Sequence, residues 1–374
     1  MSSDNRYMQT ALALAAKALG RTSPNPMVGA VIVKDGGIIG QGYHRQAGTP
    51  HAEIHALREA GSAAEGATLY VTLEPCVHYG RTPPCTMAII NAGISQVVVA
   101  TKDPNPLVAG RGIGMLEKAG VTTTVGVLEQ EARRLNEVFN KFITTGNPFV
   151  VLKSAMSLDG KIATRTGHSQ WITGAAARQC GHSLRDRYDA IMVGVGTVLA
   201  DDPLLTTRLP QGGGKNPLRI VVDSQARTPM TSKVVTDKAA PTLIAVTEQA
   251  PAEKIAALQA AGAAVLVTKA KNGRVDLTAL MRELGNRQVT SVLLEGGAAV
   301  AAAAVAEKLV DKVHFFIAPL IIGGHGAPGP VGGQGVAELT GALRLAEMHT
   351  ELLDKDLHVE ALVLKEDASC LQDS

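Results

Sequence analysis

Three side chains that can bind a soft metal ion, His51, Cys76 and Cys85, constrain the fold of this chain more than any other feature. They belong to separate segments, so a fold that uses them together must bring those segments to one place. His51 opens an expected helix over residues 51–61, and Cys76 follows an expected strand over 68–73. Cys85 begins another expected helix. A strand end must therefore lie against two helix starts, which favours an α/β fold.

The order of these ligands is typical of zinc hydrolases that deaminate nucleobases, because Glu53 stands two residues after the histidine and Pro75 precedes the first cysteine. A catalytic zinc keeps three protein ligands and one open position, where it lowers the pKa of a water molecule towards about 7. Glu53 would carry the proton from this water to the leaving ammonia. A lone His-x-Glu is more often surface chemistry, and two cysteines are more often apolar filler, but the joint order favours zinc. Eight residues separate the cysteines, unlike the general Cys-x-x-Cys signature.

Strands alternate with helices along the whole chain, which predicts mainly parallel sheets with helices on both faces. The length of 374 residues suits two domains, and a break at residues 144–148 places the boundary between 1–146 and 147–374. The turn at residues 34–37 is expected to join strands over 28–33 and 38–43 as a hairpin. Further strands are expected over residues 68–73, 96–101, 121–127, 149–155, 190–193, 219–222, 242–246, 264–267, 291–294, 312–317 and 358–364. Helices are expected over residues 7–19, 51–61, 86–91, 110–119, 128–142, 175–187, 252–261, 277–284 and 298–309.

Composition argues against two classes of protein. The net charge is only +2 and aromatic residues make up 3% of the chain, so neither a basic footprint nor a set of stacking side chains for nucleic acid is indicated. The longest mildly apolar run, residues 298–306, is too short to span a bilayer. Four cysteines, two of them in the metal motif, indicate a reducing compartment. We therefore expect a cytoplasmic protein that binds neither membranes nor nucleic acid.

Longer motifs carry a resemblance to a known family. The stretch from Thr72 to Cys85, with its long loop between the cysteines, resembles the signature of the bifunctional deaminase/reductase enzymes of riboflavin biosynthesis. Residues 24–29 and 103–106 also match that family. Matches in the second half are Ala155–Lys161, Ser169–Thr173, Gly196–Pro203, Val222–Ser224 and Glu295–Gly297. The resemblance extends over nearly the whole chain.

For residues 1–146 the resemblance implies a cytidine-deaminase-like zinc domain. Its substrate would be a diaminopyrimidinone that carries a ribosylamino 5′-phosphate. The family positions that hold this substrate are Asn25, His78, Arg81, Asp103 and Asn105. Amide and carboxylate groups can read a pyrimidine edge, and Arg81 can pair with phosphate. The residues beside prolines, Asn25, Asp103 and Asn105, are equally suited to turns.

For residues 147–374 the resemblance implies a dihydrofolate-reductase-like domain that uses NADPH to reduce the ribosyl group to a ribityl chain. The implied cofactor contacts are Ala155, Trp171, Thr197, Asp201, Ser224, Gly297, Ala298 and Ala299. The implied substrate contacts are Lys153, Ser169, Arg185, Leu205, Arg208 and Glu295. The sequence has no Gly-x-Gly-x-x-Gly fingerprint, so a Rossmann site is not supported, and the choice of NADPH over NADH comes from the resemblance alone.

Residue types leave some of these roles open. Trp171, the chain's one tryptophan, suits a stacking surface for the cofactor or a core anchor. Arg185 suits a sugar phosphate or a salt bridge on a helix surface. Lys153 lies in an apolar strand, where a charge usually lines a cavity.

Three functions are compatible with the sequence. The first is a bifunctional enzyme, a zinc deaminase followed by an NADPH reductase, which we expect to form a homo-oligomer and to act on phosphorylated pyrimidines. The second is a nucleic-acid editing protein, which the near-neutral charge and scarce aromatics oppose. The third is a reductase with a relic deaminase domain, which the intact ligands and Glu53 oppose.

Overall fold

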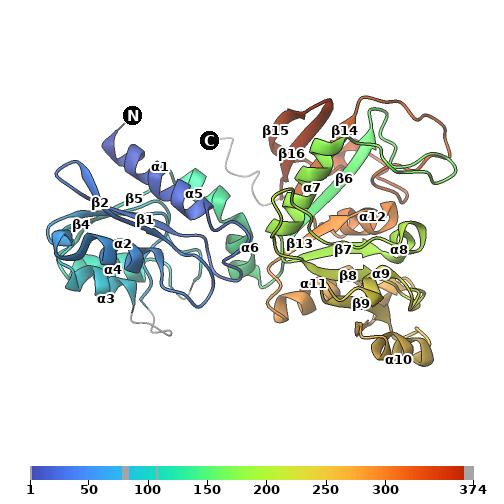
Figure 1. Ribbon diagram of the computed structural model, residues 1–374, viewed down its shortest axis with the longest axis horizontal. Helices are drawn as coiled ribbons and strands as arrows, with labels where there is room; N and C mark the ends of the chain where they lie inside the picture. Colours follow the sequence, from blue (N-terminus) through green and yellow to red (C-terminus); the bar gives the residue numbers. More distant parts are fainter. Residues whose placement is uncertain (1, 78–83, 107, 366–374) are drawn as a thin grey trace. The chain divides into compact units, whose positions relative to one another are not determined.

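The computed structural model describes residues 2–77, 84–106 and 108–365. The chain folds into two compact units, Met1–Asn147 and Pro148–Ser374. The first unit is drawn in blue to cyan and the second in green to red (Figure 1). Each unit has its own sheet and its own buried core.

The first unit contains a five-stranded sheet with the order β2-β1-β3-β4-β5. Its strands are β1 Gly29–Lys34, β2 Gly37–Tyr43, β3 Thr68–Val71, β4 Gln96–Val99 and β5 Thr122–Val125. Strands β3, β4 and β5 are parallel, but β1 is antiparallel to both β2 and β3. The sheet of this unit is therefore mixed: the expected hairpin between β1 and β2 is confirmed, and the expectation of a mainly parallel sheet holds only for β3, β4 and β5. A turn of two residues, Asp35 and Gly36, joins β1 to β2, and so short a connection can only join antiparallel strands.

Helices cover both faces of this sheet. They are α1 Ser3–Ala16, α2 Ala52–Ala60, α3 Cys85–Asn91, α4 Arg111–Lys118, α5 Glu129–Leu135 and α6 Glu137–Thr145, with a 3₁₀ turn over Gly61–Ala64. Side chains of α1 and α5 belong to one buried cluster, and those of α2, α3 and α4 belong to the cluster on the opposite face. Figure 1 shows the same two layers.

Two glycines of β2 let α2 lie unusually close to the sheet. A Cβ atom at Gly40 would overlap the carbonyl oxygen of Ala56, and one at Gly42 would overlap the side chain of His55. The helix that begins just after His51 can approach the strand only because these side chains are missing.

The helix expected over residues 128–142 is wrong as a single element. It is broken at Asn136, which separates α5 from α6. The Asn136 side chain accepts a hydrogen bond from Met27 N (2.8 Å) and donates one to Met27 O (2.9 Å). The buried Asn136 amide therefore provides the hydrogen-bond partners for the backbone of Met27, at the residue where the helix is interrupted.

The second unit contains a nine-stranded sheet with the order β10-β9-β8-β7-β13-β6-β14-β16-β15. Its strands are β6 Phe149–Ser157, β7 Ala190–Gly194, β8 Leu218–Val222, β9 Thr242–Thr247, β10 Ala264–Thr268, β13 Ser291–Glu295, β14 Lys312–Ala318, β15 Leu345–Leu353 and β16 Asp356–Val363. All pairings from β10 to β14 are parallel, while β16 and β15 are antiparallel. A small separate hairpin pairs β11 Ala270–Lys271 with β12 Arg274–Val275.

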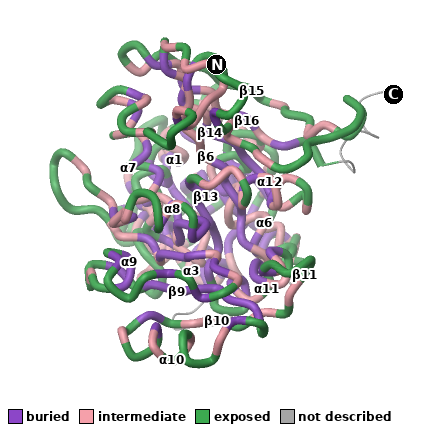
Figure 2. The backbone as a smooth tube through the Cα atoms, turned by 90° about the vertical axis from the view of Figure 1, so that its right-hand side faces the viewer, coloured by how far each residue is buried: buried purple, intermediate pink, exposed green. Residues whose placement is uncertain are grey.

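Helices again pack on both faces. They are α7 Ala175–Arg187, α8 Val195–Asp201, α9 Lys233–Thr236, α10 Ala252–Ala260, α11 Leu277–Asn286 and α12 Ala298–Ala306, with a 3₁₀ turn over Leu339–Gly341. Helices α11 and α12 belong to one buried cluster, and α8, α9 and α10 belong to the other. The central strands β13 and β6 are largely in the buried colour in Figure 2, while α10 is mostly exposed.

Two kinds of element were not expected from the sequence. Strand β15 has no alternating apolar pattern, because it lies at the end of the sheet and is exposed along most of its length. Helices α8 and α9 are short, with seven and four residues, and α8 contains a glycine. No helix in the described part of the chain is long and apolar enough to cross a membrane.

Candidate active sites in the two units

The three expected metal ligands converge in the first unit. His51 is the N-cap residue of α2, Cys76 follows β3, and Cys85 is the first residue of α3. His51 Nδ1 lies 3.2 Å from Cys85 Sγ and 3.5 Å from Cys76 Sγ. All three ligand atoms are within 4.8 Å of one another. One imidazole nitrogen and two sulfurs at this spacing fit a tetrahedral zinc that keeps its fourth position open.

The start of α3 prepares the two cysteines for metal binding. The Cys85 N–H donates a hydrogen bond to Cys76 Sγ (3.4 Å), and the Thr86 hydroxyl donates to the Cys76 carbonyl oxygen (3.2 Å). Hydrogen bonds from Cys85 lower the pKa of the Cys76 thiol. The pKa of Cys85 is raised, first by its hydrogen bond with Cys76 and then by burial. Cys76 is thus the first of the pair to become a thiolate, the form that binds metal.

Glu53 lies in the first turn of α2, beside the three ligands. Its side chain is 3% exposed, and its Oε2 atom has no hydrogen-bond partner among the described residues. Burial raises the pKa of this carboxyl, so it holds a proton more readily than an exposed glutamate. A buried carboxyl with an unused oxygen next to the metal ligands is suited to receive and return a proton.

Of the predicted deaminase substrate residues, Asn25 is joined to the metal site through His44. Asn25 Nδ2 lies 3.1 Å from His44 Nε2, and His44 Nδ1 lies 3.2 Å from the Pro50 carbonyl oxygen. Since a carbonyl can only accept, Nδ1 donates and Nε2 accepts from the Asn25 amide. The His44 ring stands edge-on to the His51 ring, with centroids 5.3 Å apart. The orientation of Asn25 is thereby tied to the metal site.

Asp103 and Asn105 lie on a loop that Glu74 holds in place. Asp103 Oδ1 accepts from the Asn105 N–H (2.9 Å). The buried Glu74 carboxylate accepts backbone hydrogen bonds from Asp103 (3.1 Å), Gly110 (3.0 Å), Gly112 (2.8 Å) and Ile113 (3.3 Å). Sequence reasoning overlooked Glu74, although it stands next to Pro75-Cys76. The predicted contacts His78 and Arg81 lie outside the described residues.

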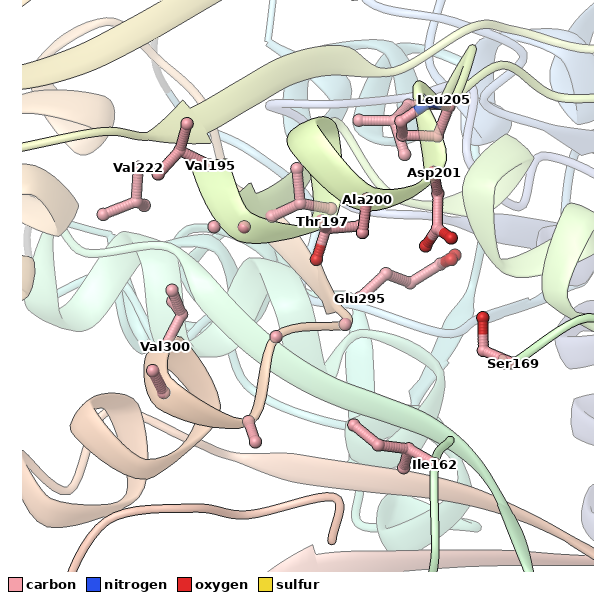
Figure 3. A pocket seen from close by; sticks show the side chains of 18 of the residues that line it. Ile162, Ser169, Val195, Thr197, Ala200, Asp201, Leu205, Val222, Glu295 and Val300 are labelled. Atoms are coloured by element: carbon pink, nitrogen blue, oxygen red, sulfur yellow. The ribbon is translucent and has the colours of Figure 1, made fainter. Parts of the chain in front are cut away.

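The second unit contains a pocket with a volume of about 1160 Å³ (Figure 3). All predicted cofactor and reductase-substrate residues line it: Lys153, Ala155, Ser169, Trp171, Arg185, Thr197, Asp201, Leu205, Arg208, Ser224, Glu295, Gly297, Ala298 and Ala299. In Figure 3, Glu295, Asp201 and Ser169 lie on one side of the pocket, and Val222 and Val195 on the other. The contacts that the resemblance implied for the second unit therefore all line one cavity.

Glu295 organises one end of this pocket. Arg185 donates to it with Nε (2.9 Å) and Nη2 (2.7 Å), and Lys153 Nζ lies 3.9 Å away. Burial alone would raise the pKa of Glu295, but Arg185 and Lys153 outweigh it and lower the pKa to about 2. The remaining Arg185 nitrogen, Nη1, donates to the Thr206 carbonyl oxygen (3.1 Å). The Arg185 guanidinium is therefore held by protein atoms, and Arg208 is the more accessible cation at this end.

Arg208 has a neighbour that the sequence analysis did not consider. Its Nη2 atom lies 3.3 Å from Nε2 of His182, which is on α7 three residues before Arg185. Burial, together with Arg185 and Arg208, lowers the pKa of His182 to about 4. The ring is therefore neutral near pH 7, and its Nε2 can accept from Arg208. Its spacing of three residues from Arg185 on a helix was the available signal.

The start of α12 faces the middle of the pocket. Gly296 and Gly297 have φ angles of 78° and 84°, a left-handed region that favours glycine. A Cβ atom at either position would come within 3.5 Å of the Thr197 hydroxyl oxygen on α8. A close glycine turn followed by a helix start can bind the phosphates of a nucleotide.

Trp171 is 68% exposed, which excludes a role as a core anchor. The Arg178 guanidinium lies over its ring, 4.8 Å from the centroid. The ring thus lines the pocket without filling the core, and is suited to stack on a planar ligand.

Comparisons with known proteins cover both units. The family described as the cytidine and deoxycytidylate deaminase zinc-binding region matches residues 1–101, and the family described as the RibD C-terminal domain matches residues 148–359. The riboflavin biosynthesis protein RibD of Actinobacillus pleuropneumoniae is 49% identical over 87% of this chain and 86% of its own length. RibD of Escherichia coli is 44% identical over 86% of this chain and 89% of its own length.

Solved structures agree with this similarity. Acinetobacter baumannii RibD aligns with a TM-score of 0.87 and 38% identity over 97% of this chain and 99% of that chain. A diaminohydroxyphosphoribosylaminopyrimidine deaminase/5-amino-6-(5-phosphoribosylamino)uracil reductase from Thermotoga maritima aligns with a TM-score of 0.85 and 36% identity, with the same coverage.

Proposed function

This chain belongs to the RibD family, a bifunctional deaminase/reductase of riboflavin biosynthesis, and from that premise we propose how its two sites divide the work. Its fold is α/β, with a cytidine-deaminase-like unit followed by a reductase unit, and its cofactors are zinc and NADPH. The first reaction deaminates 2,5-diamino-6-ribosylamino-4(3H)-pyrimidinone 5′-phosphate. The second reduces the ribosyl group and gives 5-amino-6-ribitylaminouracil 5′-phosphate. We assign deamination to residues 1–146 and reduction to residues 147–374.

The convergence of His51, Cys76 and Cys85 on one point beside the buried Glu53 is the observation that best supports the first assignment. These three residues would hold zinc, which supplies a water molecule activated for attack on the pyrimidine. Glu53 takes a proton from the attacking water and gives it to the departing ammonia. The raised pKa of Glu53 suits both steps, because the carboxyl can hold the proton between them.

The base is positioned by residues around the zinc ligands. We propose that Asn25, Asp103 and Asn105 bind the pyrimidine edge, and that His78 and Arg81 contact the substrate and its phosphate. Two observations support the first three: His44 fixes the Asn25 amide, and Glu74 fixes the loop of Asp103. Side chains that are fixed before the substrate binds favour deamination, because less entropy is then lost when the substrate is oriented for the reaction.

Reduction is assigned to the pocket of the second unit. NADPH supplies a hydride to C1′ of the substrate. We propose that Ala155, Trp171, Thr197, Asp201, Ser224 and the start of α12 at Gly297, Ala298 and Ala299 bind the cofactor. Lys153, Ser169, Arg185, Leu205, Arg208 and Glu295 bind the substrate. Arg185 acts in this set by holding Glu295, while Arg208 is accessible to the substrate phosphate.

We propose that the chain acts in the cytoplasm, does not use nucleic acid, and forms a homo-oligomer. Support for an oligomer comes from β15, which ends the sheet and exposes Leu345, Met348 and Leu352. An exposed edge strand with apolar side chains can pair with the same strand of a second copy. Sedimentation of Leu352→Lys tests this: dissociation relative to the parent chain supports the edge, and an unchanged mass rejects it.

Product analysis tests the division of labour. The diamino substrate is incubated with the full chain, with and without NADPH, and products are identified by mass spectrometry. We expect only the deaminated ribosyl product without NADPH, and the ribityl product with it. Reduction of the diamino compound before it is deaminated would reverse the proposed order. Loss of both reactions on chelation of the metal would contradict two independent sites.

A further inference from the structure

Trp171 is an exposed aromatic residue that lines the reductase pocket. It stands between Ser169, a proposed substrate contact, and the start of α7. An aromatic side chain that is not packed in a core has several accessible rotamers, and a ligand that stacks on it must select one of them at a cost in entropy. The value of Trp171 as a cofactor contact therefore depends on what holds its ring before the cofactor binds.

The backbone just after Trp171 is anchored to two elements of the second unit. The Gly174 N–H donates to Oδ2 of Asp356 (2.6 Å), a buried carboxylate at the first residue of β16. The carbonyl oxygen of Thr173, itself a buried residue, accepts from Nη1 of Arg178 on α7 (2.6 Å). Two consecutive residues of the segment are thus hydrogen-bonded to β16 and to α7, and the main chain that carries the ring is fixed.

The Arg178 side chain also covers the ring itself. Its guanidinium carbon lies 4.8 Å from the centroid of the Trp171 ring, within the range of an attractive cation–π contact. One side chain therefore binds both the backbone next to Trp171 and one face of its ring. Because Trp171 nevertheless remains largely exposed, the opposite face of the ring is open to a planar ligand in the pocket.

Arg178 could act on a ligand in two ways, because it lines the pocket as well as supporting the ring. It could contact the ligand directly, or it could act through Trp171. The contacts in the structure favour the second way. The hydrogen bond to the Thr173 carbonyl oxygen and the face of the Trp171 ring both hold the guanidinium against the protein.

We propose that Arg178 is a positioning residue of the reductase, which holds the Trp171 ring in the rotamer that stacks on the cofactor. The inference rests on the proposed reductase function, in which Trp171 contacts NADPH. A ring that is held before binding loses less entropy when the cofactor stacks on it. The attraction between a cation and an indole face is modest at an exposed site, so its loss should weaken cofactor binding roughly 2- to 5-fold. Hydride transfer in the bound complex should proceed at the same rate.

Tryptophan fluorescence of the full chain tests this directly, because Trp171 is the chain's one tryptophan. Arg178→Met should lower the fluorescence anisotropy of the ring and raise the Kd and KM for NADPH roughly 2- to 5-fold, with kcat unchanged. Arg178→Lys retains the charge and should recover part of the affinity. Arg187→Met is the matched control, because Arg187 is on the same helix but lies over the ring of the buried Tyr188. The control should match the parent in anisotropy and in affinity.

A double-mutant cycle with Trp171→Ala, measured by calorimetric titration with NADPH, separates support of the ring from direct contact with the cofactor. If Arg178 acts through the ring, Arg178→Met should weaken binding no further in a chain that already carries Trp171→Ala. Additive losses in the cycle, an unchanged affinity of Trp171→Ala, or an unchanged anisotropy of Arg178→Met would overturn the positioning role. A parent chain that does not bind NADPH would instead reject the reductase function on which the inference rests.

Discussion

The zinc site and the reductase pocket are assembled in opposite ways. The first gathers three ligand atoms within 4.8 Å, from a stretch of 35 residues between His51 and Cys85. The second is lined by residues from Lys153 to Pro328, contributed by strands, helix starts and loops. In the compact site each group performs a step that no neighbour can take over. In the pocket many groups share the binding. We therefore expect single substitutions in the zinc site to cause large losses of activity. Single substitutions in the reductase pocket should cause smaller losses that add up.

The largest effect is expected from Glu53→Gln. The amide cannot carry the proton, so deamination should fall by about 10²- to 10⁴-fold, while zinc stays bound. Reduction of pre-deaminated substrate should stay within about twofold. Glu59→Gln, an exposed position of the same helix, is the control. Equal loss of both reactions would remove the contrast between the sites. Steady-state assays and metal analysis measure all three quantities.

Glu295→Gln tests whether the stability of the second unit depends strongly on this one residue of the pocket. The substitution leaves the charges of Arg185 and Lys153 uncompensated in a buried place, which costs about 3–5 kcal/mol of stability. Glu283→Gln removes the partner of Arg287 on an exposed helix surface, where water screens the pair, and should lower the stability far less than Glu295→Gln. Denaturant unfolding measures both. Equal losses would mean that the buried pair is no more important than a surface pair.

His314→Gln tests the pH dependence of the second unit. His314 is 2% exposed, and burial first, with His358 and nearby cations, lowers its pKa to about 3. Its folded pKa is below the unfolded value near 6.5, so its contribution to stability is present above pH 6.5 and is lost as pH falls towards 3. Between pH 7 and 5 the parent should lose roughly 1–2 kcal/mol more than the variant. Parallel losses would show that His314 does not titrate in this way.

The smallest effect is expected at His182. His182→Ala removes the acceptor for Arg208, so the KM for the phosphorylated substrate should rise by roughly 2- to 10-fold with kcat unchanged. His182→Gln should restore most of the KM, because its amide oxygen can accept. Ser183→Ala, at an exposed neighbouring position on α7, is the control. A change in kcat alone would indicate a role other than positioning Arg208.

The difference between the zinc site and the reductase pocket also explains which of their residues could be predicted from the sequence. The order of His51, Glu53, Cys76 and Cys85 indicated zinc chemistry because metal ligands are few and their types restricted. The pocket residues were selected by the resemblance, since no local pattern of Ser224 or Thr197 reveals a shared cavity. Their individual roles, like the domain assignments, stay predictions.

Other features depended on tertiary partners. The helix is interrupted at Asn136, whose side-chain amide is hydrogen-bonded to the backbone of Met27. Glu74 accepts hydrogen bonds from four backbone N–H groups that are distant in the sequence. The strand β15 was overlooked because it lies at an exposed edge, where burial imposes no alternation. In each case the deciding contact lies far away in the sequence.

Gly40 and Gly42 of β2 carry no chemistry, yet they determine how well the zinc site tolerates genetic variation. Since a single methyl group at Gly42 would collide with α2, it would displace the helix that holds His51 and Glu53. A saturation mutagenesis screen for deamination should therefore find Gly40 and Gly42 nearly as intolerant as the metal ligands themselves. Selection for catalysis would then preserve positions at which no atom ever touches the substrate.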